Sequence, residues 1–169
     1  MASFVSKNSS KNLTLAAPAT TFLKEVNALT GTEFGELPLG VVLPYGMVHF
    51  KVKCPTNAQE ATLSLYLPKA GTASGFLNYG PTADNPEPHF YSFLLEDELG
   101  AVIGLNPITL YVKDGGWGDN DLTENGVIEL ICGPTKAVVP EMSAESDEDT
   151  QRPGFLNGTT EVKDWMVYE

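Results

Sequence analysis

The residues best suited to chemistry lie in one polar stretch, residues 114–128, between two apolar runs. Side chains that carry oxygen recur at alternate positions, at Asp121, Thr123 and Asn125, followed by a glycine and then an apolar residue. This spacing is typical of the first half of an EF-hand loop, where oxygen ligands surround calcium. Cys132 stands where such a loop carries its bidentate glutamate, so the stretch is not an EF-hand.

The sequence therefore predicts calcium binding by a loop of a different kind. The predicted ligands are Asp119, Asp121, Thr123 and Asn125, with Asp114 next. One alternative is a loop of Asp and Asn side chains that hydrogen-bond to its own backbone. Another is a hydrolase that uses a pair of these carboxylates, but acid and base roles require distinct environments. An exposed glycine-rich loop provides little desolvation, which argues against catalysis.

Aromatic side chains form a second candidate site. Tyr79, His89, Phe90, Tyr91 and Trp117 lie near two long loops and could stack on sugar rings. This pattern predicts a carbohydrate-binding module as an alternative function. The competing interpretation is that these rings form the edge of the core.

Composition and motifs limit the other classes of function. His49 and His89 lie outside any nucleophile motif, and the chain has no GxSxG, P-loop or GxGxxG sequence. We therefore expect no enzyme. The net charge of −12 argues against nucleic-acid binding, because nothing in the chain would neutralise a run of phosphates. The expected partner is a protein or a cell-surface component, with a glycan as the alternative.

The cysteines and the lengths of the apolar runs indicate whether the chain could form a disulfide, cross a membrane or carry a secretory signal. Cys54 and Cys132 fit no zinc pattern, and their even number allows one disulfide or two small buried side chains. No run approaches the roughly eighteen apolar residues of a membrane span. The first residues also lack the basic end and long apolar stretch of a secretory signal.

Alternating hydrophobicity predicts short strands. The run GMVHFKVKC places Val48, Phe50 and Val52 on one face, and ATLSLYLP places Leu63 and Leu65 on one face. These two neighbouring runs are predicted to pair as an antiparallel hairpin. Further strands are predicted at GFLNYG, HFYSFLLED, ITLYVKD and NGVIELIC. With 16 Gly and 12 Pro marking frequent turns, the pattern indicates an all-β antiparallel sandwich, immunoglobulin-like or jelly-roll-like.

Three segments are expected along the chain. Residues 1–34 are predicted to be a partly disordered extension, in which Leu13 and Leu15 alternate like a strand while Phe22, Val26 and Leu29 could line a short helix. Residues 35–138 form the predicted sandwich. Residues 139–169 are predicted to be an acidic linker with an apolar end, because residues 141–169 hold eight acidic and two basic side chains.

Five short motifs occur in a characteristic order. They are PYG at 44–46, LP at 67–68, YGPT at 79–82, PHFY at 88–91 and DGGWGDNDLTENGVI at 114–128. The series resembles a bacterial family of surface-directed β domains, the choice-of-anchor U domains, which commonly precede sorting tails of the IPTL-CTERM, PEP-CTERM or LPXTG kind. The resemblance covers about residues 41–134.

The resemblance implies a non-catalytic β-sandwich module at the cell surface or outside the cell. The chain shows neither a signal peptide nor a sorting tail of the family's kind. Cys54 and Cys132 replace polar or glycine positions of the family pattern. Their positions suggest a disulfide that joins the end of the first clear strand to the end of the last.

Overall fold

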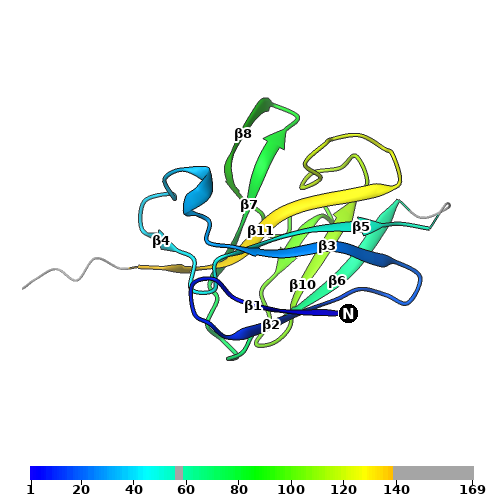
Figure 1. The fold of residues 1–169 in the computed structure, drawn as a ribbon. Helices are drawn as coiled ribbons and strands as arrows, with labels where there is room; N and C mark the ends of the chain where they lie inside the picture. The colour runs from blue at the N-terminus through cyan, green and yellow to red at the C-terminus, as the bar shows by residue number, and fades with distance from the viewer. Residues whose placement is uncertain (56–58, 139–169) are drawn as a thin grey trace, which may run out of the picture.

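Two antiparallel β-sheets pack face to face in the computed structural model, which describes residues 1–55 and 59–138 (Figure 1). The first sheet has the strand order β1 (Ala2–Val5), β2 (Asn12–Ala16), β6 (Glu60–Tyr66), β10 (Ile108–Lys113) and β9 (Gly100–Val102). The second has the order β3 (Phe22–Leu29), β5 (Met47–Lys53), β11 (Val127–Ala137), β7 (Gly75–Thr82) and β8 (Asn85–Ser92), and β4 (Val41–Val42) also pairs with β11. The predicted all-β sandwich is confirmed.

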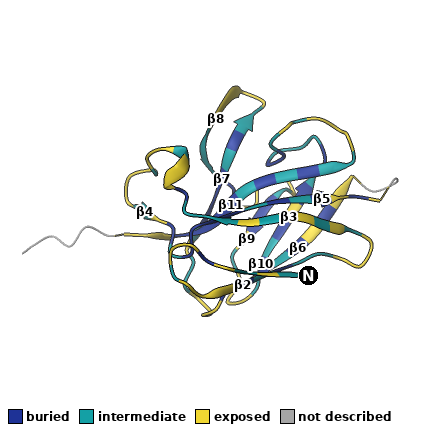
Figure 2. Ribbon diagram, viewed as in Figure 1, coloured by how far each residue is buried: buried dark blue, intermediate teal, exposed yellow. Residues whose placement is uncertain are grey.

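Alternating apolar residues from both sheets build the core. Along β5, Val48, Phe50 and Val52 are buried, whereas His49 and Lys51 between them are only partly buried. The same alternation runs along β11, where buried and half-buried residues follow each other (Figure 2). Because successive side chains of a strand point to opposite faces, each sheet contributes one apolar face to the interior.

The N-terminal residues belong to the sandwich, so the prediction of a separate extension over residues 1–34 is wrong. β1 and β2 form a hairpin at the edge of the first sheet, and Thr14 of β2 pairs with Tyr66 of β6. Leu13 and Leu15 on either side of Thr14 are 3% and 0% exposed. Their alternation is that of a strand with one face in the core, which explains why this segment joins the fold.

Residues 22–29 form β3 at the edge of the second sheet, and not the predicted short helix. The register of β3 against β5 shifts between Lys24 and Asn27, and Glu25 between them has a φ of 53°. This irregularity is a β-bulge, which adds a residue to one strand and breaks its strict alternation. The bulge is the physical reason that the apolar spacing imitates a helix.

The two clearest neighbouring strands do not pair with each other. β5 lies in the second sheet between β3 and β11, whereas β6 lies in the first sheet between β2 and β10. The connection between them therefore crosses from one sheet to the other. The predicted hairpin of these two runs is wrong because alternation reveals the buried face of a strand but not its partner.

The predicted boundary at residue 35 falls inside the sandwich, after β3. The predicted acidic linker and apolar end, residues 139–169, lie outside the described residues. Among the residues that the structure describes, no helix is both long enough and apolar enough to cross a membrane.

Candidate functional site: the loop between β10 and β11 and the cavity beside Trp117

The loop between β10 and β11 connects the two sheets and lies beside the projecting β7–β8 hairpin (Figure 1). Asp119 lies in the interior of this loop, where its side chain stabilises the loop backbone and is 1% exposed. Its Oδ2 accepts a hydrogen bond from the amide of Gly115 at 2.8 Å, and its Oδ1 accepts one from the amide of Glu129 at 2.9 Å. The carboxylate thereby ties the start of the loop to β11. Burial raises the pKa of Asp119 to about 6, although both amide bonds oppose the rise.

Asp114 is the second buried carboxylate of the loop, at 3% exposure. Its Oδ2 accepts a hydrogen bond from the amide of Gly126 at 2.7 Å, which closes the base of the loop. Its Oδ1 is buried and has no hydrogen-bond partner among the residues that the structure describes. A buried oxygen in this state is costly unless something compensates its charge.

The remaining predicted calcium ligands bind to one another at the surface. The two carboxylate oxygens of Asp121 accept hydrogen bonds from the amide of Thr123 at 2.9 Å and from Nδ2 of Asn125 at 2.6 Å. Oδ1 of Asn125 in turn accepts a hydrogen bond from the amide of Val127 at 2.9 Å. The loop therefore satisfies much of its own backbone, as the Asx-rich alternative predicts.

Of the five predicted calcium ligands, Asp114 and Asp119 are buried, whereas Asp121, Thr123 and Asn125 are exposed. Across residues 1–55 and 59–138, no group of three or more His, Cys, Asp or Glu is placed to hold a metal ion. Calcium also accepts backbone and amide oxygens, so this finding does not test the calcium prediction.

Trp117 is the aromatic residue of the loop, and its side chain is partly buried against the core. Its ring lies 5.9 Å from that of Tyr91 and 4.9 Å from that of Phe93, measured between centroids. Gly118, which follows it, has a φ of +99°, and a Cβ at this position would lie 2.4 Å from Cε2 of Phe93. Glycine is required here because both the backbone angle and the close approach exclude a side chain.

Two asparagines fasten this part of the loop to β7. Nδ2 of Asn78, a fully buried residue, donates hydrogen bonds to the carbonyl of Gly118 at 3.1 Å and to the hydroxyl of Tyr91 at 2.6 Å. Nδ2 of Asn120 donates in the opposite direction, to the carbonyl of Tyr79 at 3.1 Å. Sequence reasoning missed this reciprocal pair. The one available signal was an amide side chain within a short apolar strand.

The five predicted sugar-stacking residues do not all lie together, because the hairpin separates them. In the β7–β8 register, Asn78 pairs with Tyr91 and Tyr79 pairs with Phe90, so these two pairs point to opposite faces. Tyr79 stacks on Phe34 at 4.5 Å, away from Trp117. His89, Tyr91 and Trp117 remain together, since the centroids of His89 and Tyr91 are 5.5 Å apart.

A cavity of about 240 Å³ lies beside Trp117 and is lined by Glu96, Asp97, Leu99 and Trp117. Three of these residues come from the turn before β9, in which the amide of Glu96 donates to the carbonyl of Leu99 at 2.8 Å and the reverse bond is 3.0 Å. Sequence reasoning missed this turn, because its partner Trp117 is supplied by a distant loop.

The histidines have structural partners. Nε2 of His49 lies 2.7 Å from Oε1 of Glu129, on the outer face of the second sheet. Lys51 beside it forms ion pairs with Glu25 at 2.9 Å and with Glu129 at 3.7 Å. Nδ1 of His89 donates to the carbonyl of Glu87 at 2.9 Å. Neither histidine lines the cavity beside Trp117.

Both cysteines are free and buried, so the expected disulfide is wrong. Cys132 lies opposite Val48 in the β5–β11 register, whereas the amide of Cys54 bonds to the carbonyl of Gly126 at the other end of these strands. Six residues of extended strand separate Val48 from Cys54, roughly 20 Å, which far exceeds the Cα separation that a disulfide spans. The alternative of two small buried side chains is confirmed.

Reduction is therefore expected to leave the stability of the protein unchanged. Thermal unfolding with and without dithiothreitol should give the same midpoint, because no covalent bond constrains the unfolded chain. Thiol titration of the unfolded, unreduced protein should find both cysteines reactive. A lower midpoint after reduction would contradict the structure.

Comparisons with known proteins identify no relative. A scan against protein-family models found no match, and searches of curated proteins and of solved structures found no similar chain.

Proposed function

We propose that the chain is a non-enzymatic interaction module that binds a ligand in the cavity beside Trp117. The observation that carries the proposal is the placement of an aromatic ring in the wall of a cavity of about 240 Å³. Tyr91 and Phe93 pack against that ring. A cavity with an apolar wall and a few polar groups at its rim is the usual form of a ligand site.

The support beneath Trp117 favours binding. The hydrogen bonds of Asn78 and Asn120 hold the loop against β7 at the carbonyl of Gly118 and at the side chain of Asn120. A site held in place before the ligand arrives loses less conformational entropy on binding. The fold thus uses buried polar groups to fix the position of Trp117, whose partly buried ring also packs against the core.

The carboxylates near Trp117 support binding more than catalysis. Asp114 and Asp119 are buried, but three of their four oxygens accept hydrogen bonds from backbone amides of the loop and of β11. Glu96 and Asp97 line the cavity and are both exposed to solvent. Two carboxylates acting as acid and base need environments that differ strongly, which favours a binding role for this pair.

The proposed location is the cell surface or the exterior of the cell. It rests on the resemblance of residues 41–134 to choice-of-anchor U domains, whose motifs include the loop that carries Trp117. In this proposal the sandwich is the scaffold and the loops at one end carry recognition, a common division in β-sandwich proteins.

The test is retention of labelled protein on arrays of immobilised glycans and of short peptides. The wild type should bind a subset, Trp117→Ala should lose that binding, and Tyr66→Ala should keep it. Tyr66 is a matched control because it is 41% exposed and lies outside the lining of the cavity. Equal retention of the wild type and Trp117→Ala would refute the site. Cleavage of a retained glycan would refute the non-enzymatic role.

Calcium binding by the loop is a second part of the proposal, and the unpartnered Oδ1 of Asp114 is the observation that favours it. A calcium ion bound only to the folded state should raise the free energy of unfolding by about 2.7 kcal/mol at a hundredfold excess over Kd. Thermal unfolding in excess calcium and then in EDTA measures this difference. The rise should vanish in Asp114→Asn, and an unchanged wild-type midpoint would exclude the site.

A further inference from the structure

We infer that the ligand of the Trp117 cavity is a peptide segment rich in lysine or arginine, bound along an acidic trough that continues from the cavity. The inference rests on the proposed function and adds the chemical class of the partner. The acidic trough is defined by four carboxylate side chains, which are those of Glu60, Glu96, Asp97 and Glu98.

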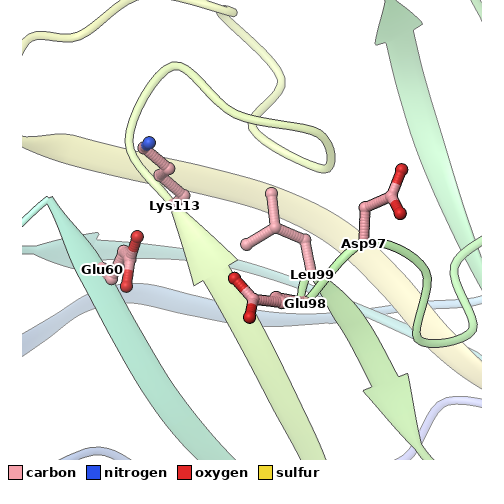
Figure 3. A pocket seen from close by; sticks show the side chains of 5 residues that line it. All are labelled: Glu60, Asp97, Glu98, Leu99 and Lys113. Atoms are coloured by element: carbon pink, nitrogen blue, oxygen red, sulfur yellow. The ribbon is translucent and has the colours of Figure 1, made fainter.

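The trough extends over three neighbouring cavities. A cavity of about 160 Å³ shares Asp97 and Leu99 with the one beside Trp117, and Figure 3 shows its lining. A third cavity, of about 380 Å³, shares Glu60 and Glu98 with the second. Because each cavity shares lining residues with the next, the three lie in succession around the turn before β9, and this succession defines the path of the trough.

The charge of this path is strongly negative. Four carboxylates line it, and Lys113 is the only basic side chain in the lining of the three cavities. Among the described residues, the ion pairs involve His49, Lys51 and their acidic partners, and none involves a carboxylate of the trough. These carboxylates are free to pair with cations from a partner, and the net charge of −12 adds long-range attraction.

Aromatic and aliphatic side chains lie at both ends of the trough. Trp117 and Leu99 form a wall of the first cavity, and Tyr111, Val102 and Leu95 line the third. The long side chains of lysine and arginine suit such a path, because their methylene stems pack on apolar surface while their charged ends reach carboxylates. A cation over the face of a tryptophan gains further attraction from the ring.

A basic peptide fits these features better than a neutral glycan does. A sugar gains from the aromatic wall but not from four carboxylates around an open path. Neutral ligands also leave the like charges of Asp97 and Glu98, which are adjacent in the turn, without compensation. The trough therefore selects a positively charged ligand, and the aromatic rings at its ends position the bound peptide.

The experiment measures binding of a fluorescein-labelled oligo-lysine peptide to the whole protein by fluorescence anisotropy. The triple variant Glu96→Gln, Asp97→Asn, Glu98→Gln should bind about tenfold more weakly, since each exposed ion pair contributes a fraction of a kcal/mol. Trp117→Ala should weaken binding by a similar factor. An oligo-glutamate peptide should not bind, and added salt should weaken oligo-lysine binding.

The control is a second triple variant, Glu36→Gln, Asp84→Asn, Glu87→Gln. It changes net charge by the same amount, and its three positions are exposed and lie outside the linings of the three cavities. We expect it to bind oligo-lysine as the wild type does, and both triple variants to keep the wild-type thermal midpoint. Equal weakening by both would show attraction by net charge alone and overturn the trough. Binding of a neutral glycan that depends on Trp117 but not on the carboxylates would overturn this inference and leave the proposed function standing.

Discussion

Asp119→Ala is expected to lower the free energy of unfolding by about 2–3 kcal/mol at pH 7. The substitution leaves the amides of Gly115 and Glu129 without their acceptor, in a place that water does not reach. Chemical denaturation at pH 7 measures the loss. Part of it is offset, because the variant no longer buries a carboxylate.

The effect of this substitution should grow as the pH falls. The folded-state pKa of Asp119, about 6, lies above its ordinary value of 3.8, so folding favours the protonated form. The stability that this group contributes is therefore complete below its unfolded pKa and is lost as the pH rises through 6. The difference between wild type and Asp119→Ala should increase by about 2.4 kcal/mol from pH 7 to pH 4 and approach about 3 kcal/mol at lower pH.

Asp121→Ala is the matched control for the loss of stability at pH 7. Asp121 belongs to the same loop, but it is exposed and its hydrogen bonds stay within the surface turn. We expect its replacement to cost less than about 1 kcal/mol. A pH-independent effect of Asp119→Ala would show that its carboxyl titrates as a solvated group does.

Gly118→Ala is expected to destabilise the protein by about 3 kcal/mol, and to displace Trp117. The added Cβ would lie 2.4 Å from Cε2 and 2.5 Å from Cζ of Phe93, a fully buried ring in the core. A positive φ costs an alanine about 1–2 kcal/mol, and overpacking typically adds about 1–3 kcal/mol. Denaturant unfolding measures the first effect, and near-ultraviolet circular dichroism of the tryptophan measures the second.

Gly126→Ala separates the two causes. Gly126 lies in the same loop with a φ of +86°, and nothing lies within 4 Å of a Cβ built on it. It should therefore show the cost of the backbone angle alone, about 1–2 kcal/mol, with the signal of Trp117 unchanged. If the two alanine variants are equally stable, the contact between Gly118 and Phe93 does not matter to the fold.

The two predictions concern adjacent residues of the loop that positions Trp117. Asp119 holds the loop backbone through charge-assisted hydrogen bonds, and Gly118 lets that backbone approach the core. Both residues act on ligand binding only through the position of Trp117. Variants of Asp119 and Gly118 that remain folded are therefore expected to bind oligo-lysine more weakly, because Trp117 is displaced. The carboxylates of the trough should keep their positions in these variants.

The sequence alone determined the fold class and the residues that face the core. Alternation at Val48, Phe50 and Val52, and again at Leu63 and Leu65, marked buried faces that the structure confirms. This information is local, because a strand buries every second side chain regardless of its neighbours. The sequence also located the loop of residues 114–128 and the aromatic character of its surroundings.

Only the tertiary structure decided which strands share a sheet and what the loop rests on. Alternation does not name a partner, so β5 and β6 were paired wrongly, and residues 1–34 were placed outside the sandwich although residues 13–15 alternate like a strand. The cavity beside Trp117 joins two segments about twenty residues apart, and Asn78 reaches Gly118 from β7. Such contacts depend on long-range packing of both sheets, which no local pattern of residues encodes.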